Sequence, residues 1–235
     1  MSTYKITVNP ECLDGDGLAR VPALYAMLIN TIGYHIKEEG FGIDDMAGRG
    51  LSWALVRCGA EFIRRPALYE SLSVIIEDGE QNGLSVSRYV TIRDSKGSDI
   101  ATGVADWCVI EKESHRPAVL EVPFDNSEAK RPCRIPRRLR PFTSGTWRKL
   151  KVGYSECDFN GHLNNCRYIE MFYDLLPFHI VSAPGGIRLD VNFKREVPLG
   201  GETVSYLKEN TESGSYDYCL HYNGTPACCA SVALF

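Results

Sequence analysis

The stretch VPALYAMLINTIGYHI, residues 21–36, is apolar around nearly the whole circumference of a helix. Pro22 suits a first helical turn and Gly40 suits a helix end, so we expect one helix over about residues 20–39. Its helical period is kept by Val21, Leu24, Tyr25, Leu28 and Ile32. The stretch is too short to span a bilayer and contains polar residues. A helix with so little polar surface must instead be wrapped by the rest of the chain.

Segments in which apolar and polar residues alternate are expected to form the strands of a sheet that packs around this helix. Alternation with a period of two is typical of strands that bury one face. The pair Asn82-Gly83 suits a hairpin turn between two of these segments. One short alternating strand, residues 4–8, precedes the helix. The strands expected after it are residues 51–63, 72–78, 84–93 and 100–110.

The second half of the chain repeats this order of elements. Ile169, Phe172, Tyr173 and Leu176 have the spacing of one helix face, and Pro177 marks the end of that helix. A strand over residues 149–155 is expected before it, and the strands expected after it are 187–193, 203–210, 216–222 and 227–234. A hand alignment places FIRRP at 62–66 over FKREV at 193–197.

This duplication predicts an α+β protein with a tandem, or double, hotdog fold. In that arrangement two long helices are each wrapped by a curved antiparallel sheet. We expect an N-terminal hotdog over residues 1–125, a linker over 126–147 and a C-terminal hotdog over 148–235. The alternative is a single α+β domain without an internal repeat.

The composition of the 235 residues is that of a folded globular protein, with 44% hydrophobic and 24% charged residues. It excludes disordered, collagen-like and coiled-coil chains. The N-terminal residues show no basic region followed by an apolar run, so we expect no secretory signal and a cytoplasmic location. The nine cysteines form no CxxC pair and have no zinc-ligand spacing, which favours free thiols and no metal or bound cofactor.

Positive charge is concentrated in one segment. Residues 130–151 hold nine basic and no acidic residues. The net charge of the whole chain is −4, so the net charge of the rest of the chain is −13. The overall charge argues against general nucleic-acid binding. Pro132, Pro136 and Pro141 interrupt the segment, which shows no clear helix or strand period and therefore supplies the expected linker.

The residues that differ between the halves carry the chemistry. Asp158, Asn160 and His162 alternate just before the second helix, so in an extended segment they would line one wall of a cleft. Glu196 takes the place that Arg65 has in the first half. Aligned by helix start, the first half has Leu13, Gly15 and Gly17 at the three alternating positions. The structural alternative is that these polar residues form turns and that Asn164 caps the helix.

This part of the chain resembles the acyl-acyl-carrier-protein thioesterases of plants and bacteria, which are double hotdog enzymes. The stretch DFNGHLNNCRYI at 158–169 fits the family pattern D-x-N-x-H-x-N-N-x-x-Y-[IV], and FKRE at 193–196 looks like the family's Y-R-R-E strand end. One departure is that many plant members carry a cysteine directly after that glutamate, where this chain has Val197. A cysteine nucleophile at that site is therefore excluded.

The resemblance implies hydrolysis of fatty acyl-acyl-carrier protein to free fatty acid and the carrier protein. Its catalytic group falls on Asp158, Asn160, His162 and Glu196. We expect Glu196 or Asp158 to act as general base, Asn160 to place the water or substrate, and His162 to complete a proton relay. Backbone N–H groups of Leu163 and Asn164 are candidates for polarising the thioester carbonyl. Further expected substrate contacts are Asn164 and, beside the first helix, Met27, Trp53 and Leu55.

The acidic carrier protein is the expected partner of the basic segment. Its docking cations would be Arg134, Arg137, Arg138 and Arg140. The alternative is that these cations only compensate acidic surface of the protein itself. A double hotdog already pairs its halves, so either a monomer or a homodimer is compatible with the sequence.

Other activities remain open at this level. The first is an acyl-CoA thioesterase, in which the arginines would meet nucleotide phosphates. A hotdog hydratase or dehydratase would convert acyl thioesters without releasing thiol, and a regulator would bind them without catalysis. A Cys157–His162 nucleophile pair is disfavoured, because Cys157 alternates away from the face of His162.

Overall fold

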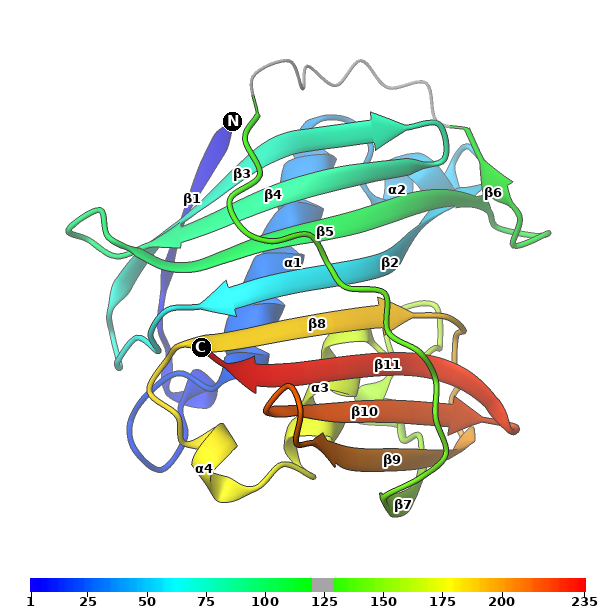
Figure 1. Cartoon of the computed structure of the whole chain (residues 1–235). Coiled ribbons are helices and arrows are strands. Elements are labelled where there is room, and N and C mark those ends of the chain that lie inside the picture. Colours follow the sequence, from blue (N-terminus) through cyan, green and yellow to red (C-terminus); the bar gives the residue numbers. More distant parts are fainter. Residues whose placement is uncertain (120–128) are drawn as a thin grey trace. The chain divides into compact units, whose positions relative to one another are not determined.

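The computed structural model describes residues 1–119 and 129–235 and contains two compact units, unit 1 at Met1–Pro136 and unit 2 at Arg137–Phe235 (Figure 1). The expected boundary between residues 125 and 126 lies outside the described residues. No helix in the described ranges has both the length and the hydropathy to cross a membrane. All nine cysteines are free thiols.

Unit 1 is one long helix against an antiparallel sheet. The sheet order is β1–β3–β4–β5–β2, and β6 pairs with β5. Its elements are β1 (Ser2–Thr7), a 3-10 turn η1 (Pro10–Cys12), α1 (Val21–Glu38), α2 (Ile43–Ala47), β2 (Leu51–Phe62), β3 (Ser71–Asn82), β4 (Ser85–Arg93), β5 (Asp99–Glu111) and β6 (Pro117–Ala118).

Helix α1 begins and ends where the sequence predicts. Arg20 is its extended N-cap, Pro22 lies in the first turn, and Gly40 has a φ of 80° just beyond the last turn. The helix contacts β3 and β4 and buries most of its apolar residues (Figure 1). Gly103 on β5 lets the sheet approach closely, because a Cβ there would lie 2.5 Å from Leu28 Cδ1.

Unit 2 has the same plan with a shorter helix. Its sheet order is β8–β11–β10–β9–β7. The elements are β7 (Thr146–Lys151), a 3-10 turn η2 (Tyr154–Glu156), α3 (Asn165–Tyr173), α4 (Phe178–Val181), β8 (Ile187–Phe193), β9 (Glu202–Asn210), β10 (Ser215–Tyr222) and β11 (Thr225–Leu234). Phe172 of α3 stacks on Tyr218 of β10 at a centroid distance of 5.0 Å and forms the centre of its core.

The double hotdog is confirmed, with two differences in detail. Helix α3 has 9 residues against 18 in α1, so the second helix is not the long one expected. The strand expected over 149–155 begins earlier and ends at Lys151, because the chain turns into η2. That turn is held by the Glu156 carboxylate, which accepts a hydrogen bond from the Gly153 N–H at 2.6 Å.

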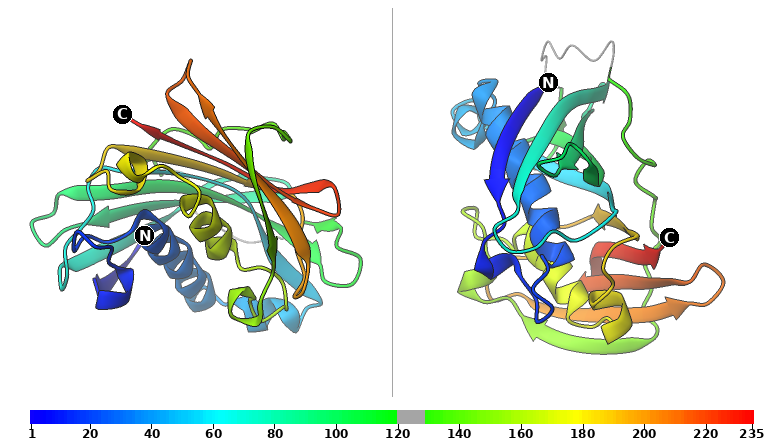
Figure 2. Two further views of the ribbon diagram at one scale, coloured as in Figure 1. Left: turned by 90° about the horizontal axis from the view of Figure 1, so that it is seen from below. Right: turned by 90° about the vertical axis from the view of Figure 1, so that its left-hand side faces the viewer.

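Residues 137–142, which we call the strap, cross one face of the unit 2 sheet while α3 covers the other (Figures 1 and 2). Arg137 donates to the buried Asp190 carboxylate from its backbone N–H at 3.1 Å and from Nε at 2.8 Å. The Leu139 N–H donates to Asn192 Oδ1 at 2.8 Å, and the Asn192 amide donates back to the Arg137 carbonyl at 2.8 Å. The strap is therefore an ordered part of unit 2.

Candidate active site

The segment that carries Asp158, Asn160 and His162 is a tight turn, so the expected extended conformation is wrong. The Asp158 N–H donates to the His162 carbonyl at 2.8 Å, and the Gly161 N–H donates to the Asp158 carbonyl at 3.0 Å. Gly161 has a φ of 75°, which favours glycine. Asp158 Oδ1 accepts the N–H groups of Asn160 at 2.8 Å and of His162 at 3.2 Å, so this carboxylate organises the turn.

The turn lies against the end of β8, which brings His162 to Glu196. His162 forms a β-bridge with Pro198, and the Leu163 N–H donates to the Val197 carbonyl at 2.8 Å. His162 Nδ1 then lies 3.5 Å from Glu196 Oε2. The two side chains are 29% and 50% exposed, so water and a substrate can reach the pair. An imidazole held by a carboxylate is a suitable acid–base group near neutral pH.

The backbone N–H groups expected to polarise the carbonyl are already engaged. The Leu163 N–H bonds to Val197, as above, and the Asn164 N–H donates to the Glu156 carbonyl at 2.9 Å. That expectation is therefore wrong. The Asn164 side chain is the N-cap of α3 and accepts the Cys166 N–H at 2.8 Å, which is the structural alternative open at the sequence level.

Unit 1 contains the same turn. The Asp14 N–H donates to the Leu18 carbonyl at 3.0 Å, and Asp14 Oδ1 accepts the N–H groups of Asp16 and Leu18. The Ala19 N–H donates to the Pro66 carbonyl at 2.8 Å, as Leu163 does to Val197 in unit 2. The counterparts of Asp158, Asn160, His162 and Glu196 are thus Asp14, Asp16, Leu18 and Arg65.

The expected counterparts Leu13, Gly15 and Gly17 are therefore wrong by one residue. The error arises at the helix start, since Arg20 is an extended cap and α1 begins at Val21. Unit 1 does keep the aspartate, but it lacks the histidine and the glutamate.

In unit 1, Arg65 occupies the position that Glu196 has in unit 2. Its side chain is 1% exposed and forms an ion pair with Asp14. Burial acts to raise the pKa of Asp14, but the hydrogen bonds from Arg65 and from the Asp16 N–H outweigh it and hold that pKa below its ordinary value. The corresponding place in unit 2 holds the half-exposed Glu196 instead.

Cys157 is unsuited to act as a nucleophile. Its Sγ donates to the Gly153 carbonyl at 3.4 Å. Desolvation and the charges of Asp158 and Glu156 raise the pKa of its thiol. The low reactivity expected of this residue agrees with its place in the turn.

The residues expected to contact the acyl chain lie in unit 1. Leu55 is buried on β2 and Met27 is half-buried on α1. Trp53 donates from Nε1 to the Phe41 carbonyl at 2.8 Å and packs on a small core around Met46. The contacts of Trp53 therefore indicate a packing role.

The four expected docking arginines differ in their contacts. Arg134 pairs with Glu61 at 2.8 Å, and Arg137 pairs with Asp190 at 2.8 Å. Arg138 and Arg140 are exposed. For the first two, compensation of the protein's own acidic groups accounts for the charge.

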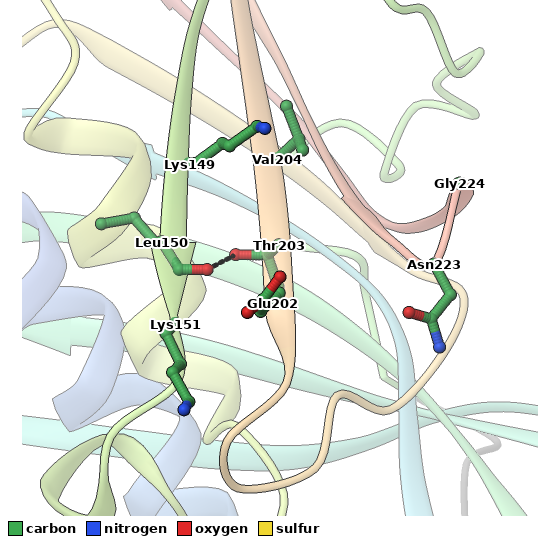
Figure 3. Close-up of a pocket in the computed structure, with 8 residues that line it drawn as sticks. All are labelled: Lys149, Leu150, Lys151, Glu202, Thr203, Val204, Asn223 and Gly224. Carbon is green, nitrogen blue, oxygen red and sulfur yellow. Dashed lines mark hydrogen bonds between the residues drawn. The ribbon is translucent and has the colours of Figure 1, made fainter.

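Two features were missed at the sequence level. One is a pocket of about 480 Å³ beside β7, lined partly by Lys149 and Lys151 (Figure 3). The other is a buried cluster in unit 1, where His35 Nε2 lies 3.2 Å from Glu39 and 3.7 Å from Asp78. Their spacing resembles a set of metal ligands. Arg88 lies 3.1 Å from Asp78 and 3.3 Å from Glu39, so its positive charge already balances the carboxylates.

Comparison with known proteins matches both units. The acyl-ACP thioesterase N-terminal domain matches residues 1–135, and the acyl-ACP thioesterase C-terminal domain matches residues 140–231. A comparison with curated proteins found no significant match.

Solved structures of similar proteins cover the whole chain. An acyl-ACP thioesterase from Bacteroides thetaiotaomicron is 26% identical, with a TM-score of 0.89 over 100% of this chain and 97% of its own. A 12:0-ACP thioesterase from Umbellularia californica is 18% identical and has the same fold, with a TM-score of 0.83 over 99% of this chain and 97% of its own. Because both family domains match the chain in order, the chain belongs to the acyl-ACP thioesterase family and hydrolyses acyl-ACP thioesters.

Proposed function

We propose that the acyl-ACP thioester is hydrolysed at the His162–Glu196 pair of unit 2, with Asn160 and Asp158 in supporting roles. The observation that carries this proposal is the 3.5 Å approach of His162 Nδ1 to Glu196 Oε2 in a turn open to solvent. The repeated turn in unit 1 has Leu18 and Arg65 at these two positions, so it offers neither group.

Glu196 acts as the general base and His162 as a proton relay. Glu196 accepts a proton from water as the water oxygen attacks the carbonyl carbon and forms a tetrahedral oxyanion. Collapse of this intermediate breaks the C–S bond. The thiolate takes the proton of His162 Nε2 while Nδ1 receives the proton held by Glu196. The products are the free fatty acid and the carrier thiol, and the exposed imidazole regains its first tautomer by exchange with solvent.

Asp158 is a positioning residue in this scheme. Its Oδ1 accepts two N–H groups of the turn, and Asp14 does the same in a unit without the reactive pair. Asn160 lies at the exposed tip of the turn. Because the Leu163 and Asn164 N–H groups are engaged, the Asn160 amide is our candidate donor to the oxyanion.

Candidate substrate-binding residues are found in each unit. Met27 and Leu55 are our candidates for lining the acyl pocket beside α1, and Asn164 contributes by fixing the start of α3. Arg138 and Arg140 are the docking cations for the acidic carrier protein, since Arg134 and Arg137 already hold carboxylates of this chain. Nine free thiols fit a reducing compartment such as the cytoplasm.

Thiol release from acyl-carrier protein tests the site. We expect Asn160→Ala to slow release by about tenfold or more, since one oxyanion donor is lost. Asp16→Ala is its matched control, because Asp16 holds the same turn position in unit 1 and is also exposed. Equal loss in both variants would show that the turn tip acts only through folding.

A further inference from the structure

The pocket beside β7 is formed entirely by residues of unit 2. Lys149 and Lys151 from β7, Glu202, Thr203 and Val204 from β9, and Asn223 and Gly224 from the turn between β10 and β11 line it (Figure 3). The wall between the two strands is fixed, because Thr203 Oγ1 donates to the Leu150 carbonyl at 3.1 Å. Two ammonium groups against one carboxylate give the pocket a net positive charge.

The two ammonium groups make no ion pair with the described part of the chain. Within residues 1–119 and 129–235, no carboxylate lies within ion-pair distance of Lys149 or Lys151. Glu202 is the cross-strand neighbour of Lys151 and still makes no such pair. These two cations differ from Arg134 and Arg137, whose charges are already balanced.

The repeated unit lacks this arrangement. By the register of β1 on β3, the counterparts of Lys149, Lys151 and Val204 are Lys5, Thr7 and Ser73. Lys5 Nζ donates to Ser73 Oγ at 2.6 Å, so its ammonium is held on the sheet. In unit 2 valine replaces the serine and a second lysine replaces the threonine. Of the two equivalent sheet positions, only those of unit 2 therefore carry two lysines that make no hydrogen bond to a side chain across the strand pair, within the described residues.

The pocket is connected to the reactive turn by a short run of contacts. Lys151 Cε lies 3.9 Å from the place of a Cβ on Gly200. The Gly200 N–H donates to the Val152 carbonyl, and the Leu199 N–H donates to the Gly161 carbonyl, both at 2.9 Å. Gly161 is next to His162, which bridges Pro198. The turn at residues 158–162 and the segment at residues 198–200 therefore connect the pocket with the His162–Glu196 site.

We propose that this pocket binds the phosphodiester from which the phosphopantetheine arm extends toward the reactive pair. The inference rests on the proposed function. Lysine ammonium groups are good partners for phosphate oxygens, and the Asn223 amide adds a further donor. A phosphate at this place would orient the arm before the thioester reaches His162. Coenzyme A carries the same phosphopantetheine chemistry, so the two sources must be separated by experiment.

The test compares hydrolysis of four thioesters that carry the same acyl group. The substrates are its esters with carrier protein, phosphopantetheine, coenzyme A and pantetheine, which lacks phosphate. We expect Lys149→Ala with Lys151→Ala to raise KM about tenfold for the carrier and phosphopantetheine esters, the scale of lost charge-assisted hydrogen bonds. Turnover of the pantetheine ester should stay unchanged, which also shows that the variant is folded. Lys5→Ala with Lys96→Ala, two exposed cations of unit 1, controls for net charge.

Three results would overturn the proposal. Loss on the carrier ester alone would place the lysines against the carrier surface, and equal loss on all four esters would indicate a change in folding. Loss confined to the coenzyme A ester would assign the pocket to nucleotide phosphates. Failure of the proposed function is distinct, because the His162→Ala and Glu196→Gln variants would then release thiol from every ester as fast as the unaltered enzyme does.

Discussion

The turns before α1 and α3 share a backbone and differ in chemistry. Asp14 and Asp158 each bond to the same N–H groups two and four residues later. Beyond that, unit 1 has a leucine and a buried arginine where unit 2 has His162 and the half-exposed Glu196. The comparison separates what the fold needs from what the reaction needs. An aspartate that is kept in both copies is explained by the turn alone.

The largest effect is expected where the two turns differ. His162→Ala or Glu196→Gln should lower kcat by about a hundredfold or more, because each removes an acid–base group, while leaving the fold intact. Asp158→Ala should lower kcat through loss of the turn geometry. Single-turnover thiol release with circular dichroism as a folding check measures both. Near-normal turnover in any two of the three variants contradicts the assignment.

Asp14, the unit 1 counterpart of Asp158, allows a test of what this aspartate contributes to stability. Asp14→Ala removes the Asp14–Arg65 ion pair and should lower the free energy of unfolding by about 2 kcal/mol, with kcat little changed in the folded enzyme. Urea unfolding of this variant beside Asp158→Ala gives the comparison. A larger kcat effect for Asp14→Ala than for Asp158→Ala would reverse the roles of the two units.

The His35 cluster gives unit 1 a dependence on pH. Burial would lower the pKa of His35, but hydrogen bonds from the imidazolium to the Asp78 and Glu39 carboxylates, together with their negative charges, outweigh it and raise that pKa to about 9. Tyr4 and Arg88 also face the cluster. The folded-state pKa lies above the ordinary 6.5, so this stabilisation is complete below pH 6.5 and is lost as pH rises through 9.

The expected loss of unfolding free energy between pH 6.5 and 9.5 is about 3 kcal/mol, since one pKa unit corresponds to about 1.4 kcal/mol. Urea titrations at the two values measure it, and His35→Gln should remove this difference. If His35→Gln keeps the full difference, other groups cause the pH dependence.

The smallest effect is expected at the docking cations. Arg138→Glu with Arg140→Glu should raise KM for acyl-carrier protein by about threefold at low salt and by less at high salt, because salt screens exposed charges. KM for acyl-pantetheine should not change. Arg137→Glu is a poor substitute, since it would also disrupt the strap. Equal effects on both substrates would rule out a docking role.

Much of the fold could be predicted from alternation and turn residues. The strand at Ile187–Phe193 has the predicted bounds, and the other strands of its sheet agree within two residues, apart from β7. Period-two patterning fixes which face of a strand is buried, so long strands are well marked. The helix α1 was equally clear because both its ends carry signals.

The turn at residues 158–162 was harder to predict than the strands. The sequence indicated the residue types of the candidate site but predicted an extended conformation where the chain forms a turn. Alternating polar residues fit an extended strand, whereas Asp158 bonds to its own backbone and forms a turn. The pairing of His162 with Glu196 depends on a contact between segments more than thirty residues apart, which spacing alone does not give. Alternating polar residues at Arg188, Asp190 and Asn192 inside a buried strand were an available signal for the strap.

The strap also changes where the chain can be divided. Asp190 is fully buried and Asn192 nearly so, and both obtain hydrogen bonds from residues 137–139. A C-terminal fragment that starts at residue 148 would therefore lack the residues that cover the Asp190 carboxylate of β8. Exchange of this half between related enzymes should be made before Arg137. The proline-rich, highly charged composition around the strap suggests a linker that could be removed. In this protein, however, the strap covers one face of the unit 2 sheet, and we expect an isolated unit 2 to need it in order to stay soluble.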